Sequence, residues 1–80
     1  MDQKKLLERI TSNQKIFGGK PIIRGLRISV ATILSLLAQG VSIDAILEDH
    51  PSLQREDIQA CLAYAHTVIA NDSLDNIRVG

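Results

Sequence analysis

The feature that most constrains this chain is a change of hydrophobic period at Ser29. From there on, apolar side chains follow the i, i+3, i+4, i+7 spacing of an amphipathic helix, at Val30, Ile33, Leu34 and Leu37. Ser29 is a suitable N-cap, and Gly40 stands where a left-handed residue commonly ends a helix. The sequence therefore predicts a helix between Ser29 and Gly40.

Two tight junctions divide the rest of the chain into two further helices. Ser42 is a suitable cap for the second helix, and His50-Pro51 ends it because a residue before proline is pushed out of helical geometry. The third helix begins near Gln54, and its apolar stripe fades at Asn71 after about four turns. We therefore expect a mainly α protein with three helices.

The segment before Ser29 has turn and short-strand chemistry instead. Residues 15–29 hold three of the five glycines, one proline and alternating apolar and basic positions, and a strand over residues 22–28 would let arginines project from one side. Residues 3–9 could form a turn or two of helix, and residues 10–12 have strand character. We expect one domain over residues 1–80, with a core at 10–70 and a C-terminal tail at 71–80.

The chain is small for its apolar content. A domain of 80 residues buries only about 60 to 65% of its unfolded surface, yet 45% of these residues are hydrophobic. A subunit interface readily absorbs such a surplus. We therefore expect a homodimer or a tight complex with another protein.

Charge is divided along the chain although the formal net charge is zero at pH 7. Residues 1–30 carry seven basic groups against two acidic ones, a net of +5, and residues 31–80 carry two against seven, a net of −5. Four cations of the positive half are interleaved with glycines that allow close approach to a phosphate, and we expect them to contact nucleic acid: Lys15, Lys20, Arg24 and Arg27. The alternative is that Arg24 and Arg27 pair with carboxylates of the acidic half and hold this segment on the helices.

The helices have the spacing of a helix-turn-helix domain, although a plain three-helix bundle is an equal alternative. In a helix-turn-helix protein the first turn of the last helix enters the major groove. Here that turn contains Arg55, Glu56 and Asp57, so two carboxylates would face phosphates. We do not expect this helix to read bases in the usual way.

The sequence offers no constellation for catalysis, a metal or a cofactor. Cys61 falls on the apolar stripe of the last helix, as a buried thiol would, and no second cysteine exists for a disulfide or a zinc site. Pro21 lacks the amide that a phosphate loop at Gly18-Gly19-Lys20 would need. Because no such constellation is found, we expect a protein that is not an enzyme. Because the sequence has no apolar run of membrane-spanning length and no signal peptide, we expect it to be cytoplasmic and to make no membrane contact.

Several stretches together resemble a known family. They are Phe-Gly-Gly-Lys-Pro-Ile-Ile-Arg-Gly-Leu-Arg-Ile at 17–28, Leu-Ala-Gln-Gly at 37–40, Asp-His-Pro-Ser-Leu at 49–53 and Asp-Ile-Gln-Ala-Cys-Leu-Ala-Tyr-Ala at 57–65. About residues 10–66 are similar to the small bacterial domain-of-unknown-function family 433. The resemblance implies a homeodomain-like three-helix fold with short N-terminal strands. Family members usually have a better cap than Gln54, so the last helix is expected to start less firmly here.

The resemblance also implies an antitoxin role, in which the protein binds and silences a PIN-like ribonuclease toxin and the pair can repress its own promoter. We therefore expect a homodimeric antitoxin that contacts operator DNA through the four cations named above. The last helix and the tail would bind the toxin, through Tyr64, Leu74, Ile77 and Val79. The alternative is a protein-interaction module without DNA binding.

Overall fold

The structure is a computed structural model, and it describes residues 2–71. Over these residues the order of elements is α1 (Gln3–Leu7), β1 (Ile10–Thr11), a 3₁₀ turn η1 (Phe17–Gly19), β2 (Ile22–Ile23), α2 (Val30–Ala38), α3 (Ile43–Asp49) and α4 (Arg55–Ala70). The expected mainly α class with short N-terminal strands is confirmed, and α1 adds a fourth helix to the three that were expected. Three of the residues expected to bind a partner, Leu74, Ile77 and Val79, lie outside the described residues.

Helices α2 and α3 begin at the two serines that the sequence indicates. The Ser29 hydroxyl accepts a hydrogen bond from the Thr32 amide at 3.1 Å, and the Ser42 hydroxyl accepts one from the Ala45 amide at 3.1 Å. Gly40 follows α2 in left-handed geometry, with φ +88°. In each helix a local side chain thus accepts a hydrogen bond from one of the free amides of the first turn.

Helix α4 begins differently, because Gln54 stands at its cap. The carboxylate of Asp57, inside the first turn, accepts a hydrogen bond from the Gln54 amide at 2.8 Å. A side chain three residues after the cap that bonds back to the cap amide is half of a capping box. The first turn of α4 is therefore bonded through Asp57, and a weaker start caused by Gln54 stays a prediction.

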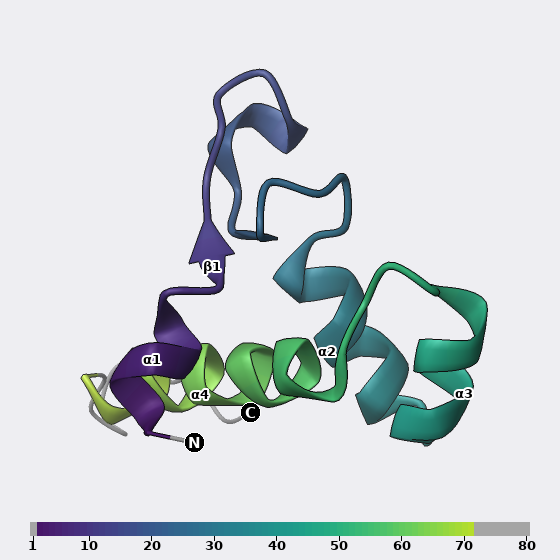
Figure 1. Ribbon diagram of the computed structural model, residues 1–80. Helices are drawn as coiled ribbons and strands as arrows, with labels where there is room; N and C mark the ends of the chain where they lie inside the picture. The colour runs from purple at the N-terminus through teal and green to yellow at the C-terminus, as the bar shows by residue number, and fades with distance from the viewer. Residues whose placement is uncertain (1, 72–80) are drawn as a thin grey trace, which may run out of the picture.

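Residues 10–29 form a projection that we call the arm. Strand β1 pairs antiparallel with β2, with Ile10 opposite Ile23, and the chain between the two strands turns back through η1. In Figure 1 the arm rises away from α1 and α4, which lie along the base, while α2 and α3 lie to one side. The arm ends at Ser29, where α2 starts.

The expected strand alternation over residues 22–28 is wrong, because β2 ends at Ile23. The next two residues, Arg24 and Gly25, have φ of +45° and +72° and reverse the chain. Left-handed geometry is uncommon for a residue with a side chain and costs about 1–3 kcal/mol. The two arginines of this segment therefore need not point to the same side.

The core lies where β2 meets the three longer helices. Its buried members are Ile23, Val30, Ile33, Ile46, Leu53, Ile58 and Cys61. Helix α1 contributes a single buried side chain, that of Leu6, and packs along α4. Within residues 2–71, no helix combines the length and apolar character needed to cross a membrane.

Candidate nucleic-acid interface

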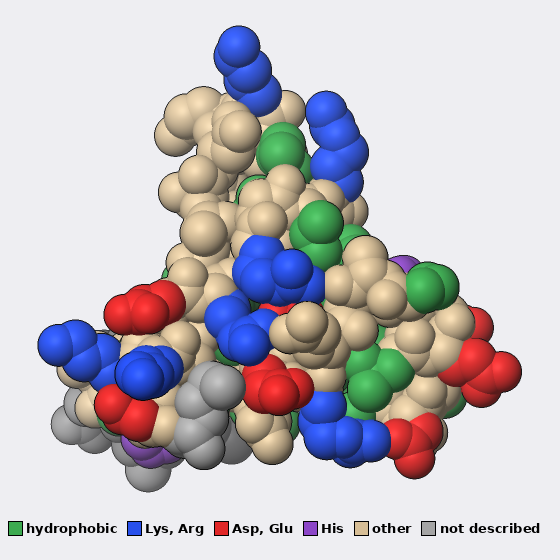
Figure 2. All heavy atoms as spheres, viewed as in Figure 1, with side chains coloured by type: hydrophobic (Ala, Val, Ile, Leu, Met, Phe, Trp, Pro, Cys, Tyr) green, Lys and Arg blue, Asp and Glu red, His purple; other side chains and the backbone are tan. Residues whose placement is uncertain are grey.

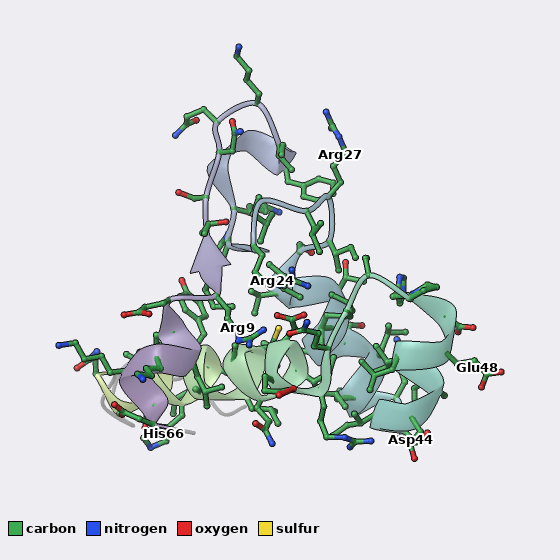
Figure 3. All side chains as sticks on the ribbon, viewed as in Figure 1. Arg9, Arg24, Arg27, Asp44, Glu48 and His66 are labelled. Carbon is green, nitrogen blue, oxygen red and sulfur yellow. The ribbon has the colours of Figure 1, made fainter. Side chains whose placement is uncertain are left out.

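A single carboxylate, that of Asp57, ties the arm to α4. Its side chain is fully buried. Arg24 of the arm binds it with two hydrogen bonds, from Nε to Oδ1 at 3.0 Å and from Nη2 to Oδ2 at 2.9 Å. Arg9, between α1 and β1, donates from Nη1 to Oδ1 at 2.9 Å. Figure 3 shows both labelled arginines directed at the start of α4.

Both arginines make further hydrogen bonds. Arg24 Nη2 donates to the Ser52 carbonyl at 2.7 Å, and the Arg24 amide donates to the Arg9 carbonyl at 2.8 Å. Arg9 Nη1 donates to Gln54 Oε1 at 3.0 Å. In the described part of the chain, no buried polar side-chain atom is left without a partner. We call these residues, Arg9, Arg24, Ser52, Gln54 and Asp57, the Asp57 cluster.

Hydrogen bonding keeps the Asp57 cluster charged. Burial alone would raise the pKa of Asp57, but the hydrogen bonds from Arg24, Gln54 and Arg9 outweigh it and lower the pKa below its ordinary value of 3.8. The hydrogen bond to Asp57 raises the pKa of Arg24 in turn. At neutral pH the carboxylate of Asp57 and the guanidinium group of Arg24 are therefore ionised.

Arg24 and Arg27 were expected either to contact nucleic acid or to pair with carboxylates of the acidic half, and the structure differs between the two residues. Arg24 pairs with a carboxylate of the acidic half, the geometry in which a bidentate guanidinium is strongest. Arg27 forms no ion pair with any of residues 2–71, and in Figure 3 it points away from the helices. The structure thus gives Arg24 a partner inside the protein and leaves Arg27 facing solvent.

All four cations expected at nucleic acid are exposed, and three of them form no ion pair within residues 2–71. These three are Lys15, Lys20 and Arg27, which we call the outer cations. Figure 2 shows Lys and Arg side chains standing out from the upper end of the molecule, over the arm. No described acidic residue pairs with any of the three. Their charge is available to a polyanion.

The first turn of α4 presents less negative charge than its sequence suggests. Asp57 is turned inward onto the two arginines, and only Glu56, which is half-buried, remains of the two carboxylates. The one cation of this turn, Arg55, forms an ion pair with Asp44 of α3. Neither sign of charge predominates there, so the arm is the more cationic surface.

The second half of α4 carries exposed apolar side chains. Leu62, Val68 and Ile69 are exposed by 47%, 44% and 61%, and we call Leu62 and Ile69 the α4 apolar face. Leu62 and Ile69 are seven residues apart, two helical turns, and so lie on the same side. Tyr64, the one described residue among those expected to bind a partner, is half-buried against the core. The apolar stripe that predicts the last helix runs to Ile69, and the sequence does not indicate that its final residues extend past the core.

Cys61 is buried among the core side chains. Burial, together with the nearby charge of Asp57, raises the pKa of its thiol to about 12. The thiol is therefore protonated at neutral pH, whereas a nucleophile or a metal ligand needs the thiolate. Among residues 2–71, no three His, Cys, Asp or Glu side chains are grouped so that they could hold a metal ion.

Comparison with known proteins gives one family. The model of the family described as "Protein of unknown function (DUF433)" matches residues 10–65. The chain belongs to the DUF433 family. The matched stretch begins at β1 and ends inside α4, so it includes the arm, both helix junctions and Asp57, whereas Arg9 and α1 precede it.

A curated relative of this DUF433 chain is "Uncharacterized protein y4eO" of Sinorhizobium fredii (strain NBRC 101917 / NGR234). The two are 40% identical over 58 residues, which are 72% of this chain and 26% of that protein. This chain thus corresponds to only a part of its relative's length. No solved structure matches the chain.

Proposed function

We propose that this chain is a non-enzymatic antitoxin that binds DNA through the arm and a PIN-like ribonuclease toxin through α4. The observation that carries the DNA half is the division of the arm's cations. Arg24 is held by Asp57, while Lys15, Lys20 and Arg27 face solvent. Exposed cations on a projecting segment attract phosphates, and their contacts dominate the affinity of most DNA-binding proteins.

The proposal includes a homeodomain-like helix-turn-helix arrangement of α2, α3 and α4 in a homodimer. In the usual version of that fold the last helix supplies the main base contacts. Here the ion pair of Arg55 with Asp44 leaves the start of α4 without a free cation. We therefore assign phosphate contact to the arm and not to the last helix.

Salt dependence tests this half of the proposal. Each neutralised phosphate contributes about −0.9 to the slope of log K against log salt concentration. Three outer cations predict a slope of about −3 for one chain and about −5 for a dimer that engages both arms. The measurement is fluorescence anisotropy with a labelled duplex of the DNA upstream of the reading frame, between 50 and 200 mM salt. Absence of binding at the lowest salt concentration contradicts the proposal.

The α4 apolar face supports the toxin half of the proposal. Exposed large apolar side chains that gather on one face of a helix are typical of protein interfaces. Leu62 and Ile69 lie two turns apart, which is the spacing by which a helix anchors itself in a groove. In addition to this face, Tyr64, Leu74, Ile77 and Val79 stay predicted partner contacts.

Co-purification tests the toxin half. The protein is co-expressed with the product of the adjacent reading frame, and we expect the double variant Leu62→Asp/Ile69→Asp to lose at least about 90% of the captured partner, because each carboxylate would be buried unpaired. Gln59→Glu, an exposed polar position on the same helix, is the control and should retain the partner. Equal capture by the double variant and the wild type would exclude this face as the binding surface.

The α4 apolar face also favours a second candidate function, a protein-interaction module without DNA binding. The two functions differ in one result. A chain that captures its partner through Leu62 and Ile69 but binds no duplex at low salt is an interaction module. Capture together with a salt slope of about −3 or steeper fits the antitoxin.

A further inference from the structure

The 3₁₀ turn η1 of the arm carries an exposed aromatic side chain on strained backbone. Phe17 is 51% exposed, and its φ is +51°. Gly18 and Gly19 follow with φ of +64° and +88°, so three successive residues are left-handed. Glycine or asparagine adopts this geometry readily and phenylalanine does not. Burial does not offset the strain at Phe17, because half of the residue's surface is exposed.

The turn that presents Phe17 is fixed by hydrogen bonds. The amide of Ile16 donates to the Asn13 carbonyl at 2.8 Å, and the amide of Gly19 donates to the Ile16 carbonyl at 3.1 Å. Ile16 is itself buried, so it anchors the turn while the next residue is held outward. The turn thus holds the exposed side chain of Phe17 in a defined position. Strained residues of this kind concentrate at functional sites.

The surroundings of Phe17 match those of a DNA-intercalating side chain. The outer cations lie on either side of it in the sequence, with Lys15 two residues before and Lys20 three residues after, and Arg27 follows in the next turn of the arm. Apart from its two neighbours in the chain, a side chain at Gly18 would meet no atom within 4 Å, so there is open space at this position. Minor-groove proteins combine cations with an apolar wedge that enters one base step.

We propose that Phe17 is a wedge that inserts into a base-pair step of duplex DNA from the minor groove, while the outer cations bind the flanking phosphates. This inference rests on the proposed DNA binding. A single aromatic suits insertion at one step, whereas single-strand platforms stack successive bases on several aromatics. Phe17 and Tyr64 are the chain's two aromatic residues, and Tyr64 lies half-buried on α4.

Two variants test the wedge with a labelled duplex of the upstream DNA. Phe17→Asn keeps a residue that tolerates left-handed backbone but removes the ring, so we expect an unchanged or higher melting temperature and an affinity lower by about tenfold. Energy transfer between dyes at the duplex ends should report a bend of about 20–90° with the wild type, lost with the variant. Phe17→Trp introduces the chain's only tryptophan, whose fluorescence should be quenched on binding.

The outcomes separate this inference from the function on which it rests. A Phe17→Asn variant that binds and bends the duplex as the wild type does overturns the wedge and leaves cation-mediated DNA binding standing. If the wild type binds no duplex at low salt, the proposed DNA binding fails first, and the wedge with it. Quenching of Phe17→Trp by the single strand alone, or by phosphatidylserine vesicles and not by the duplex, also overturns the wedge.

Discussion

Asp57→Ala is expected to lower the free energy of unfolding by about 3–5 kcal/mol, because it removes a fully buried carboxylate on which two arginines and one backbone amide converge. A domain of this length has a total stability of about 4–12 kcal/mol. The melting temperature should therefore fall by about 12 °C or more, as measured by circular dichroism. Asp44→Ala is the matched control: its carboxylate forms the exposed ion pair with Arg55, and its loss should change stability by less than about 1 kcal/mol.

A second variant keeps the test informative if Asp57→Ala does not fold. Asp57→Asn preserves the shape of the side chain but not its charge, and a loss of about 2 kcal/mol is expected. Because the folded-state pKa of Asp57 lies below its ordinary value of 3.8, its stabilisation is present above that pH and is lost as pH falls through the folded-state pKa. Wild-type stability should thus fall more steeply below about pH 4 than that of Asp57→Asn. An Asp57→Ala variant as stable as the wild type would contradict this account of the cluster.

The double variant Lys20→Glu/Arg27→Glu is expected to weaken binding to duplex DNA by about 100-fold at low salt, because two phosphate contacts become repulsions. Both side chains are exposed and neither pairs with a described carboxylate, so the melting temperature should stay within about 3 °C of the wild type. Affinity is measured by anisotropy and stability by circular dichroism.

A matched control separates local contact from overall charge. Lys4→Glu/Lys5→Glu makes the same change of net charge at two exposed positions of α1, away from the arm. It should weaken duplex binding by less than about threefold, the remainder being long-range repulsion screened by salt. An equal loss in both double variants would mean that the arm makes no specific contact with DNA.

Local signals explain why much of the fold could be predicted from the sequence. Ser29 and Ser42 bond amides three residues away, and Gly40 supplies a left-handed residue, so each boundary is decided within a few positions. Helix α1 was indicated only weakly because it is short and buries one side chain, Leu6. A helix of that size depends on packing against α4, which its own sequence does not encode.

The roles of the charged side chains could not be predicted in the same way. Asp57 reads as a first-turn carboxylate facing outward, and it is buried because Arg9 and Arg24, 48 and 33 residues away in the chain, converge on it. Arg24 and Arg27 have the same chemistry in the sequence. Their surroundings differ because the left-handed geometry of Arg24 and Gly25 follows the end of β2 and reverses the chain before Arg27. The strain at Phe17 could not be predicted either, because nothing about a phenylalanine indicates positive φ.

The most direct test measures melting temperature and duplex affinity together, for Arg24→Ala and for Lys20→Glu/Arg27→Glu. Arg24 holds the arm on α4, and we propose that the outer cations bind DNA. We predict that Arg24→Ala melts about 10 °C or more below the wild type and, where folded, binds the duplex nearly as well. The double variant should show the reverse. An Arg24→Ala variant with an unchanged melting temperature and a clear loss of DNA binding would contradict the account.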